Sequence, residues 1–183
     1  MSIRFPLSAL LLLPLALLCS ACSTISSKPL GPSLQNVAEL PPVGGKSSVE
    51  QQLEAPVVML HFLASWCTLC SYELPHLIAL RRSISEENLG IVAVAVDDTP
   101  EAAIEMASRN QLPFPVLIDT QGATKELFAL SDLPTTILLT PQGTRVDIRD
   151  PKTGDITNRF VGAYTWDRGD ILAALKTRLA IKP

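Results

Sequence analysis

Unbroken apolar runs and helically spaced apolar positions alternate along most of this chain. Runs of consecutive apolar residues predict strands that are covered on both faces, because such strands carry no polar side. These runs lie at 57–63, 91–96, 114–118 and 135–139. Elsewhere the apolar spacing is helical, and the expected helices cover about 67–85, 99–110, 123–130 and 167–179.

The order of these elements predicts an α/β fold. Strands and helices alternate at first, which is typical of parallel strands. Two further extended pieces, at 145–149 and 157–161, add an antiparallel part before the last helix. A short helix is also expected near residue 50, where Ser47 and Glu50 have the spacing of a capping box. We therefore expect a central mixed β-sheet flanked by helices.

Composition narrows the choice of function. The chain has 183 residues, of which 47% are hydrophobic and 18% charged, and a formal net charge of -3. One domain of this length can bury a sizeable core. The charges are near balance and Arg81-Arg82 is an isolated basic pair, so no nucleic-acid partner is expected.

The N-terminus has the pattern of an export signal. Arg4 is followed by an uncharged apolar stretch, Phe5–Leu18, and then by the small residues Ser20-Ala21. A stretch of 14 residues is short for a membrane span, which needs about 20. We expect residues 1–21 to be a signal peptide, 22–45 a flexible tether rich in Ser, Pro and Gly, and 46–183 the folded domain.

Cys22 refines the expected location. The residues before it resemble a bacterial lipoprotein signal, in which cleavage precedes a cysteine that then carries the lipid. The resemblance implies a protein anchored at Cys22 on the periplasmic face of a bacterial membrane. The alternative is ordinary cleavage after Ala21, which leaves a soluble periplasmic protein with a free thiol at Cys22.

The most informative motif is Trp66-Cys67-x-x-Cys70, which joins an apolar run to a helical pattern. Cys19 is lost with the signal and Cys22 is assigned to the lipid, so Cys67 and Cys70 remain in the domain. A cysteine at a helix N-terminus is favoured as a thiolate. The pair therefore predicts thiol–disulfide chemistry; the alternatives are a permanent disulfide or half of a metal site.

Several stretches together resemble the TlpA/ResA/DsbE-like exported thiol-disulfide oxidoreductases, which have a thioredoxin-like fold. The resemblance extends over about 43–179, and the helix near 99–110 matches the central helical insertion of that branch. The stretches that carry it are Ala64-Ser65-Trp66-Cys67, Glu73-Leu74-Pro75, Val94-Ala95-Val96-Asp97, Phe114-Pro115-Val116-Leu117-Ile118-Asp119 and Pro134-Thr135-Thr136.

The resemblance implies roles for the residues around the dithiol. Cys67 is the expected nucleophile, and Cys70 is the expected resolving cysteine. Pro134 is expected in the cis form opposite the dithiol. The backbone of Leu133 is expected to pair with an extended substrate segment, on a docking surface to which Trp66 and Thr135 also contribute.

Two further residues are candidates for proton transfer. Glu73 stands three residues after Cys70, where ResA-like proteins have an acid that can relay the Cys70 proton; the alternative is a solvated helix residue. His61 lies where thioredoxins hold a buried acid, so it is a possible relay, although a core histidine is the preferred interpretation. His76 is expected on a helix surface. We expect no metal site and no cofactor besides the Cys67–Cys70 disulfide.

The resulting hypothesis is a membrane-tethered enzyme that reduces protein disulfides. The resemblance implies apocytochrome c or another exported metalloprotein as substrate, and a membrane electron donor of the DsbD/CcdA type. A thiol oxidase or disulfide isomerase is the nearest alternative, because Thr68-Leu69 between the cysteines leaves the redox potential open. A copper-handling thiol protein is another alternative. A peroxiredoxin-like peroxidase is a third, although its Pro-x-x-x-Thr-x-x-Cys setting is absent. The polar segment 150–155 has no predicted role.

Overall fold

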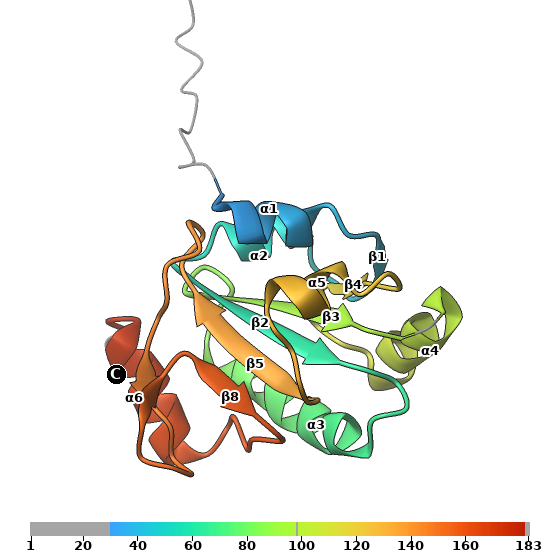
Figure 1. Cartoon of the computed structure of the whole chain (residues 1–183). Helices are drawn as coiled ribbons and strands as arrows, with labels where there is room; N and C mark the ends of the chain where they lie inside the picture. The colour runs from blue at the N-terminus through green and yellow to red at the C-terminus, as the bar shows by residue number, and fades with distance from the viewer. Residues whose placement is uncertain (1–29, 98, 182–183) are drawn as a thin grey trace, which may run out of the picture.

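A computed structural model describes residues 30–97 and 99–181. Its centre is a six-stranded sheet in the order β1-β4-β3-β2-β5-β8, with helices on both faces (Figure 1). The elements in chain order are α1 (Pro32–Ala38), β1 (Pro42–Gly44), α2 (Val49–Leu53), β2 (Val57–Leu63), α3 (Thr68–Ser83), β3 (Leu89–Ala95), α4 (Pro100–Asn110), β4 (Val116–Ile118), α5 (Ala123–Leu127), β5 (Thr135–Leu139), β6 (Ile148–Arg149), β7 (Ile156–Thr157), β8 (Arg159–Val161) and α6 (Gly169–Arg178).

The sheet is mixed, as the order of the elements predicts. Strands β2, β3 and β4 are parallel, whereas β1 pairs antiparallel with β4, β5 with β2, and β8 with β5. All seven residues of β2 and of β3 are buried, which explains why both strands consist mainly of apolar residues. The predicted fold class, a mixed α/β sheet flanked by helices, is therefore confirmed, including a helix (α4) between β3 and β4.

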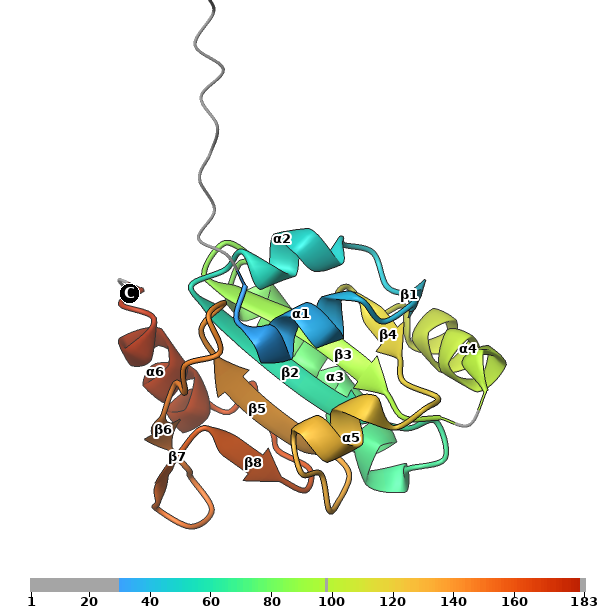
Figure 2. The ribbon, with the colours of Figure 1, turned by 45° about the horizontal axis from the view of Figure 1, so that its top comes forward.

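Alternate side chains of β2 enter two different cores. Met59 and Leu63 belong to the core that also contains the buried faces of α3, α4 and α6. Leu60 and Phe62 belong to the opposite core, which contains the buried side chains of α1 and α2. Figure 2 shows α1 and α5 in front of the sheet and α3 behind it. The carboxyl end of β2, where α3 begins, is thus fixed from both faces.

The predicted tether is wrong for residues 30–45, which are part of the folded domain. Helix α1 buries Leu34 and Val37 completely, and β1 pairs with β4 in the main sheet. The Pro- and Gly-rich composition concealed two apolar residues at helical spacing, too short a pattern to predict a helix. Residues 1–29, with the predicted signal peptide and Cys22, lie outside the described residues.

Two local predictions differ in detail from the structure. The N-cap of α2 is Ser48 rather than Ser47, since the Ser48 hydroxyl accepts the Gln51 N–H at 3.1 Å. The predicted antiparallel part divides in two: β6 and β7 form a separate two-stranded sheet, and β8 extends the main one. Among the described helices, none is both long and apolar enough to span a membrane.

Candidate functional site

Cys67 is the N-cap of α3 and forms a disulfide with Cys70. Its sulfur accepts the backbone N–H of Cys70 at 3.1 Å, so the helix N-terminus points at this atom. Cys67 is 8% exposed and Cys70 is fully buried. Of the two sulfurs, that of Cys67 is therefore the one that a partner can reach, and the helix dipole stabilises it as a thiolate once the disulfide is reduced.

The loop that carries Cys67 is fastened to the end of β3. Asp97 is buried, and its two carboxylate oxygens accept the backbone N–H of Ser65 at 2.9 and 3.1 Å. The Ser65 hydroxyl donates to the same carboxylate. Sequence reasoning noted Asp97 only as a point of family resemblance. The signal that could have identified its role is its position, two residues after the end of a strand that is parallel to β2.

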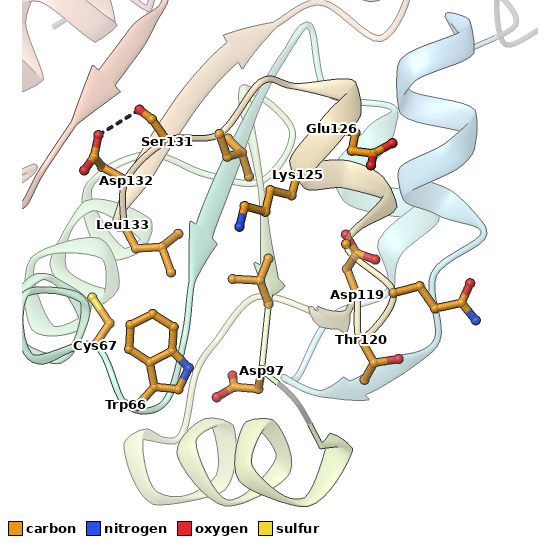
Figure 3. Close-up of a pocket in the computed structure, with 14 residues that line it drawn as sticks. Trp66, Cys67, Asp97, Asp119, Thr120, Lys125, Glu126, Ser131, Asp132 and Leu133 are labelled. Carbon is orange, nitrogen blue, oxygen red and sulfur yellow. Dashed lines mark hydrogen bonds between the residues drawn. The ribbon is translucent and has the colours of Figure 1, made fainter.

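The segment before β5 lines the groove together with Cys67. The Leu133–Pro134 peptide bond is cis, as the resemblance implies, and Pro134 is buried. Leu133 lines the same groove as Trp66 and Cys67, and Figure 3 shows these three side chains on one wall of it. Thr135 differs from its predicted role, because its buried hydroxyl donates to the Asp132 carbonyl at 2.7 Å. Its side chain holds the loop in place instead of facing the groove.

The groove beside the dithiol has a mixed lining, in which most of the charged side chains are acidic. It has a volume of about 930 Å³, and its far wall is the start of α5. Asp119 is buried there and accepts the backbone N–H groups of Ala123 and Thr124. Figure 3 shows the Lys125 side chain reaching into the groove from α5. The lining residues are Trp66, Cys67, Val96, Asp97, Asp119, Thr120, Gln121, Gly122, Lys125, Glu126, Leu130, Ser131, Asp132 and Leu133.

Three large apolar side chains close to the cysteines are exposed. Trp66 precedes Cys67, Leu69 lies between the cysteines, and Tyr72 follows in the first turns of α3; their exposed fractions are 67%, 54% and 62%. Exposed apolar side chains that gather at one place are typical of an interaction surface. Cys67 thus lines the groove and is close in sequence to these exposed apolar side chains.

Glu73 is fully buried on α3, so the alternative of a solvated helix residue is wrong. Its Oε1 accepts the indole N–H of Trp166, whereas Oε2 has no hydrogen-bond partner. Burial raises the pKa of Glu73 to about 7, against smaller opposing effects of Trp166, the Tyr164 backbone and Lys152. Residues three apart on a helix share a face, so Glu73 lies on the same face of α3 as Cys70.

His61 is also fully buried, on β2. One ring nitrogen, Nδ1, is 2.9 Å from the Thr136 hydroxyl, and Nε2 has no partner. Burial lowers the pKa of His61 to about 3, so the ring is neutral and a weak base. The geometry supports the interpretation as a core histidine over that of a proton relay.

His76 contacts another element, which was not predicted for it. Its Nδ1 is 2.7 Å from the Asp167 carboxylate, just before α6, and its ring packs edge-on against Tyr72. In the part of the chain that the structure describes, no group of three or more His, Cys, Asp or Glu side chains could hold a metal ion.

A mixed sheet with a cysteine pair at the start of the helix after its central strand, and with a cis-proline directly before the strand that pairs with it, defines a thioredoxin-like protein. Residues 34–147 match the AhpC/TSA family, so the chain belongs to that family. The fold is also similar to that of a Chlorobium tepidum protein assigned as a thiol:disulfide interchange protein DsbE. The TM-score is 0.59 and the identity 22%, over 78% of this chain and 94% of that one.

Named relatives support the resemblance found in the sequence. The thiol-disulfide oxidoreductase ResA of Oceanobacillus iheyensis is 36% identical over 116 residues, which are 63% of this chain and 55% of that protein. ResA of Bacillus subtilis is 29% identical over 120 residues, or 66% of this chain and 65% of its own length. The match thus spans between half and two thirds of these relatives.

Proposed function

We propose that this protein is an exported thiol-disulfide oxidoreductase that reduces disulfides of other proteins with the Cys67–Cys70 dithiol. The observation that carries the proposal is the disulfide at the N-terminus of α3, with Cys67 reachable and Cys70 buried. The similarity to proteins named ResA supports it.

The difference in exposure between Cys67 and Cys70 supports an order for the two thiols. The Cys67 thiolate attacks one sulfur of the substrate disulfide, and a mixed disulfide forms as the other substrate thiolate leaves. Cys70 then attacks Cys67, which releases the second substrate thiol and closes the disulfide seen here. Because Cys70 is buried, its thiol has to lose its proton within the protein. Glu73, on the same helical face, is the acid–base group that we assign to this step.

The exposed surface fits an extended, apolar substrate segment. Such a segment can pack on Trp66 and Leu69 beside Cys67 while its backbone pairs with that of Leu133. By resemblance we infer apocytochrome c or another exported metalloprotein as the source of this segment. Since the outside compartment is oxidising, a membrane electron donor of the DsbD/CcdA type is needed to reduce the protein again. We further infer a lipid anchor at Cys22 on the periplasmic side of a bacterial membrane.

Trapping with the Cys70→Ser variant tests the proposal. Without the resolving thiol, Cys67 should stay covalently bound to its substrates, which can be recovered from cells and released with a reductant. Cys67→Ser is the matched control and should trap far less, because the reachable nucleophile is missing. If Cys70→Ser recovers no covalent partner beyond this control, the proposed function is wrong.

A further inference from the structure

The surroundings of Glu73 are specific enough to assign a role to a second residue. Both Glu73 and Trp166 are fully buried, and they lie 93 residues apart in the sequence. An indole N–H can only donate a hydrogen bond, so the oxygen that it contacts is the acceptor. Here that oxygen is Oε1, whereas Oε2 is buried without a partner.

We propose that Trp166 is a positioning residue for Glu73, because its indole N–H occupies Oε1 and leaves Oε2 as the oxygen that takes up and gives back the proton. This inference rests on the proposed function for its catalytic meaning. A buried carboxylate oxygen without a donor is costly when charged. That cost falls when Oε2 is protonated, and the indole hydrogen bond to Oε1 is compatible with both states.

The proton balance of the reaction gives Oε2 a defined task. When Cys70 attacks the mixed disulfide, its thiol proton passes to Oε2 and the Cys70–Cys67 bond replaces the bond between Cys67 and the substrate. The departing substrate thiolate then receives a proton, with Glu73 returning to its ionised form. The substrate disulfide is the oxidant, since it gains two electrons and two protons while the dithiol becomes a disulfide.

Trp166 is itself held by the polar segment for which the sequence predicted no role. The segment 150–155 connects β6 and β7, and its Asp150 accepts the hydroxyl of Tyr164 at 2.7 Å. Lys152 lies 3.5 Å from the centre of the Tyr164 ring and donates to the Ala163 carbonyl. The Tyr164 and Trp166 rings are in turn 5.3 Å apart. The β6–β7 connection thus fixes the aromatic residues that place the indole on Glu73.

Several other titratable groups lie near Glu73 or on the elements around it. Lys152, from the β6–β7 connection, favours the charged form of Glu73, and Tyr164 interacts with both Glu73 and Asp150. Further titratable groups on the neighbouring elements include Cys70 on α3, the neutral His61 on β2, and the His76–Asp167 pair between α3 and the start of α6.

The pKa of Glu73 in the oxidised protein provides the test, since no domain thiol titrates in that state. Glutamate labelled at the side-chain carboxyl carbon allows an NMR titration, with Glu73→Gln to assign the signal. Trp166→Phe keeps an aromatic ring but removes the N–H, so the carboxylate loses its side-chain donor. The pKa of Glu73 should then rise by about one to two pH units. An unchanged pKa in folded Trp166→Phe overturns the proposal.

A second measurement needs no change at Trp166, in case that variant does not fold. The chain contains two tryptophans, and Trp66→Phe leaves Trp166 as the remaining fluorophore. Its emission in the oxidised protein should follow the titration of Glu73, with a midpoint near the value measured by NMR. This transition should vanish when Glu73→Gln is added. Emission that does not titrate, or that titrates equally without Glu73, contradicts the contact.

The two proposals fail in different ways. If Trp166→Phe shifts the pKa of Glu73 but Cys70→Ser traps no substrate, the positioning role holds and the proposed function is wrong. If trapping succeeds, Trp166→Phe should also move the pH profile of substrate reduction in the direction of the Glu73 pKa. If trapping succeeds but Trp166→Phe changes neither the pKa of Glu73 nor the pH profile of substrate reduction, the positioning role is wrong and the proposed function stands.

Discussion

The Asp97 carboxylate holds the backbone N–H of Ser65 with both of its oxygens, at 2.9 and 3.1 Å. Asp97 follows β3 and Ser65 follows β2, so the contact ties together the ends of two neighbouring parallel strands. Cys67 comes two residues after Ser65 and caps α3. The loop that presents the reachable sulfur is therefore fixed by a group outside the cysteine motif.

Removing this carboxylate should loosen the loop. Asp97→Ala deletes the acceptor for the Ser65 N–H and hydroxyl, and we expect a loss of about 1–3 kcal/mol in the free energy of unfolding. Asp97→Asn keeps one carbonyl acceptor and should lose less. Urea denaturation of the oxidised proteins measures both values. Equal stability of wild type and Asp97→Ala contradicts the role assigned to this contact.

The buried Glu73 should make stability depend on pH. Its pKa in the folded protein is raised to about 7 from 4.5, so the folded state holds this proton more tightly than the unfolded state. The stability that Glu73 contributes is fully present below pH 4.5 and is lost as pH rises through about 7. Glu73→Gln does not titrate. The free energy of unfolding of Glu73→Gln minus that of wild type should therefore increase by about 3 kcal/mol from acid to alkaline pH.

Chemical denaturation of the oxidised proteins at several pH values gives this difference directly. Glu50→Gln is a suitable control, because Glu50 lies on the surface of α2, away from the core of α3. If the difference in free energy of unfolding between Glu73→Gln and wild type does not depend on pH, burial does not raise the pKa of Glu73, and the account is contradicted.

His61 should make the protein less stable in acid, which is the opposite of the effect of Glu73. Its pKa is lowered to about 3 from 6.5, so the unfolded state binds this proton more readily. The stability that depends on neutral His61 is present above pH 6.5 and is lost as pH falls towards 3. Wild type should lose about 5 kcal/mol of its free energy of unfolding over this pH range because His61 has to be protonated. His61→Gln, which keeps an amide near Thr136, should not show this loss. Acid unfolding that is the same in both proteins is the contrary result.

Much of this arrangement can be predicted from the sequence because its signals are local. The mainly apolar runs predicted β2 and β5 with their observed ends, since strands buried on both faces are rich in apolar residues. The motif at Cys67 and Cys70 was equally clear, because the two cysteines and the strand before them are close together in the sequence.

Contacts between distant segments could not be predicted in the same way. The Asp97–Ser65 and Glu73–Trp166 contacts join residues 32 and 93 positions apart, and no periodicity relates them. Helix α1 was missed for a different reason. Its two buried residues, Leu34 and Val37, are stabilised by packing against the sheet, which overrides a composition typical of a tether.

The predicted anchor can be tested without reference to the fold. Cys22→Ala removes the cysteine to which the resemblance assigns the lipid, so the protein should move from the membrane fraction to the soluble fraction of cells. Cys19→Ala is the matched control, because Cys19 lies within the segment expected to be removed. Unchanged membrane association of Cys22→Ala contradicts the lipid anchor.

The reduction potential of the Cys67–Cys70 couple tests the central claim most directly. It can be obtained by equilibrating the protein with thiol–disulfide buffers of known composition and counting free thiols. A protein that reduces other proteins' disulfides should have a potential closer to that of thioredoxin, about -270 mV, than to that of the oxidant DsbA, about -120 mV. A value near that of DsbA contradicts the reductase and favours an oxidase.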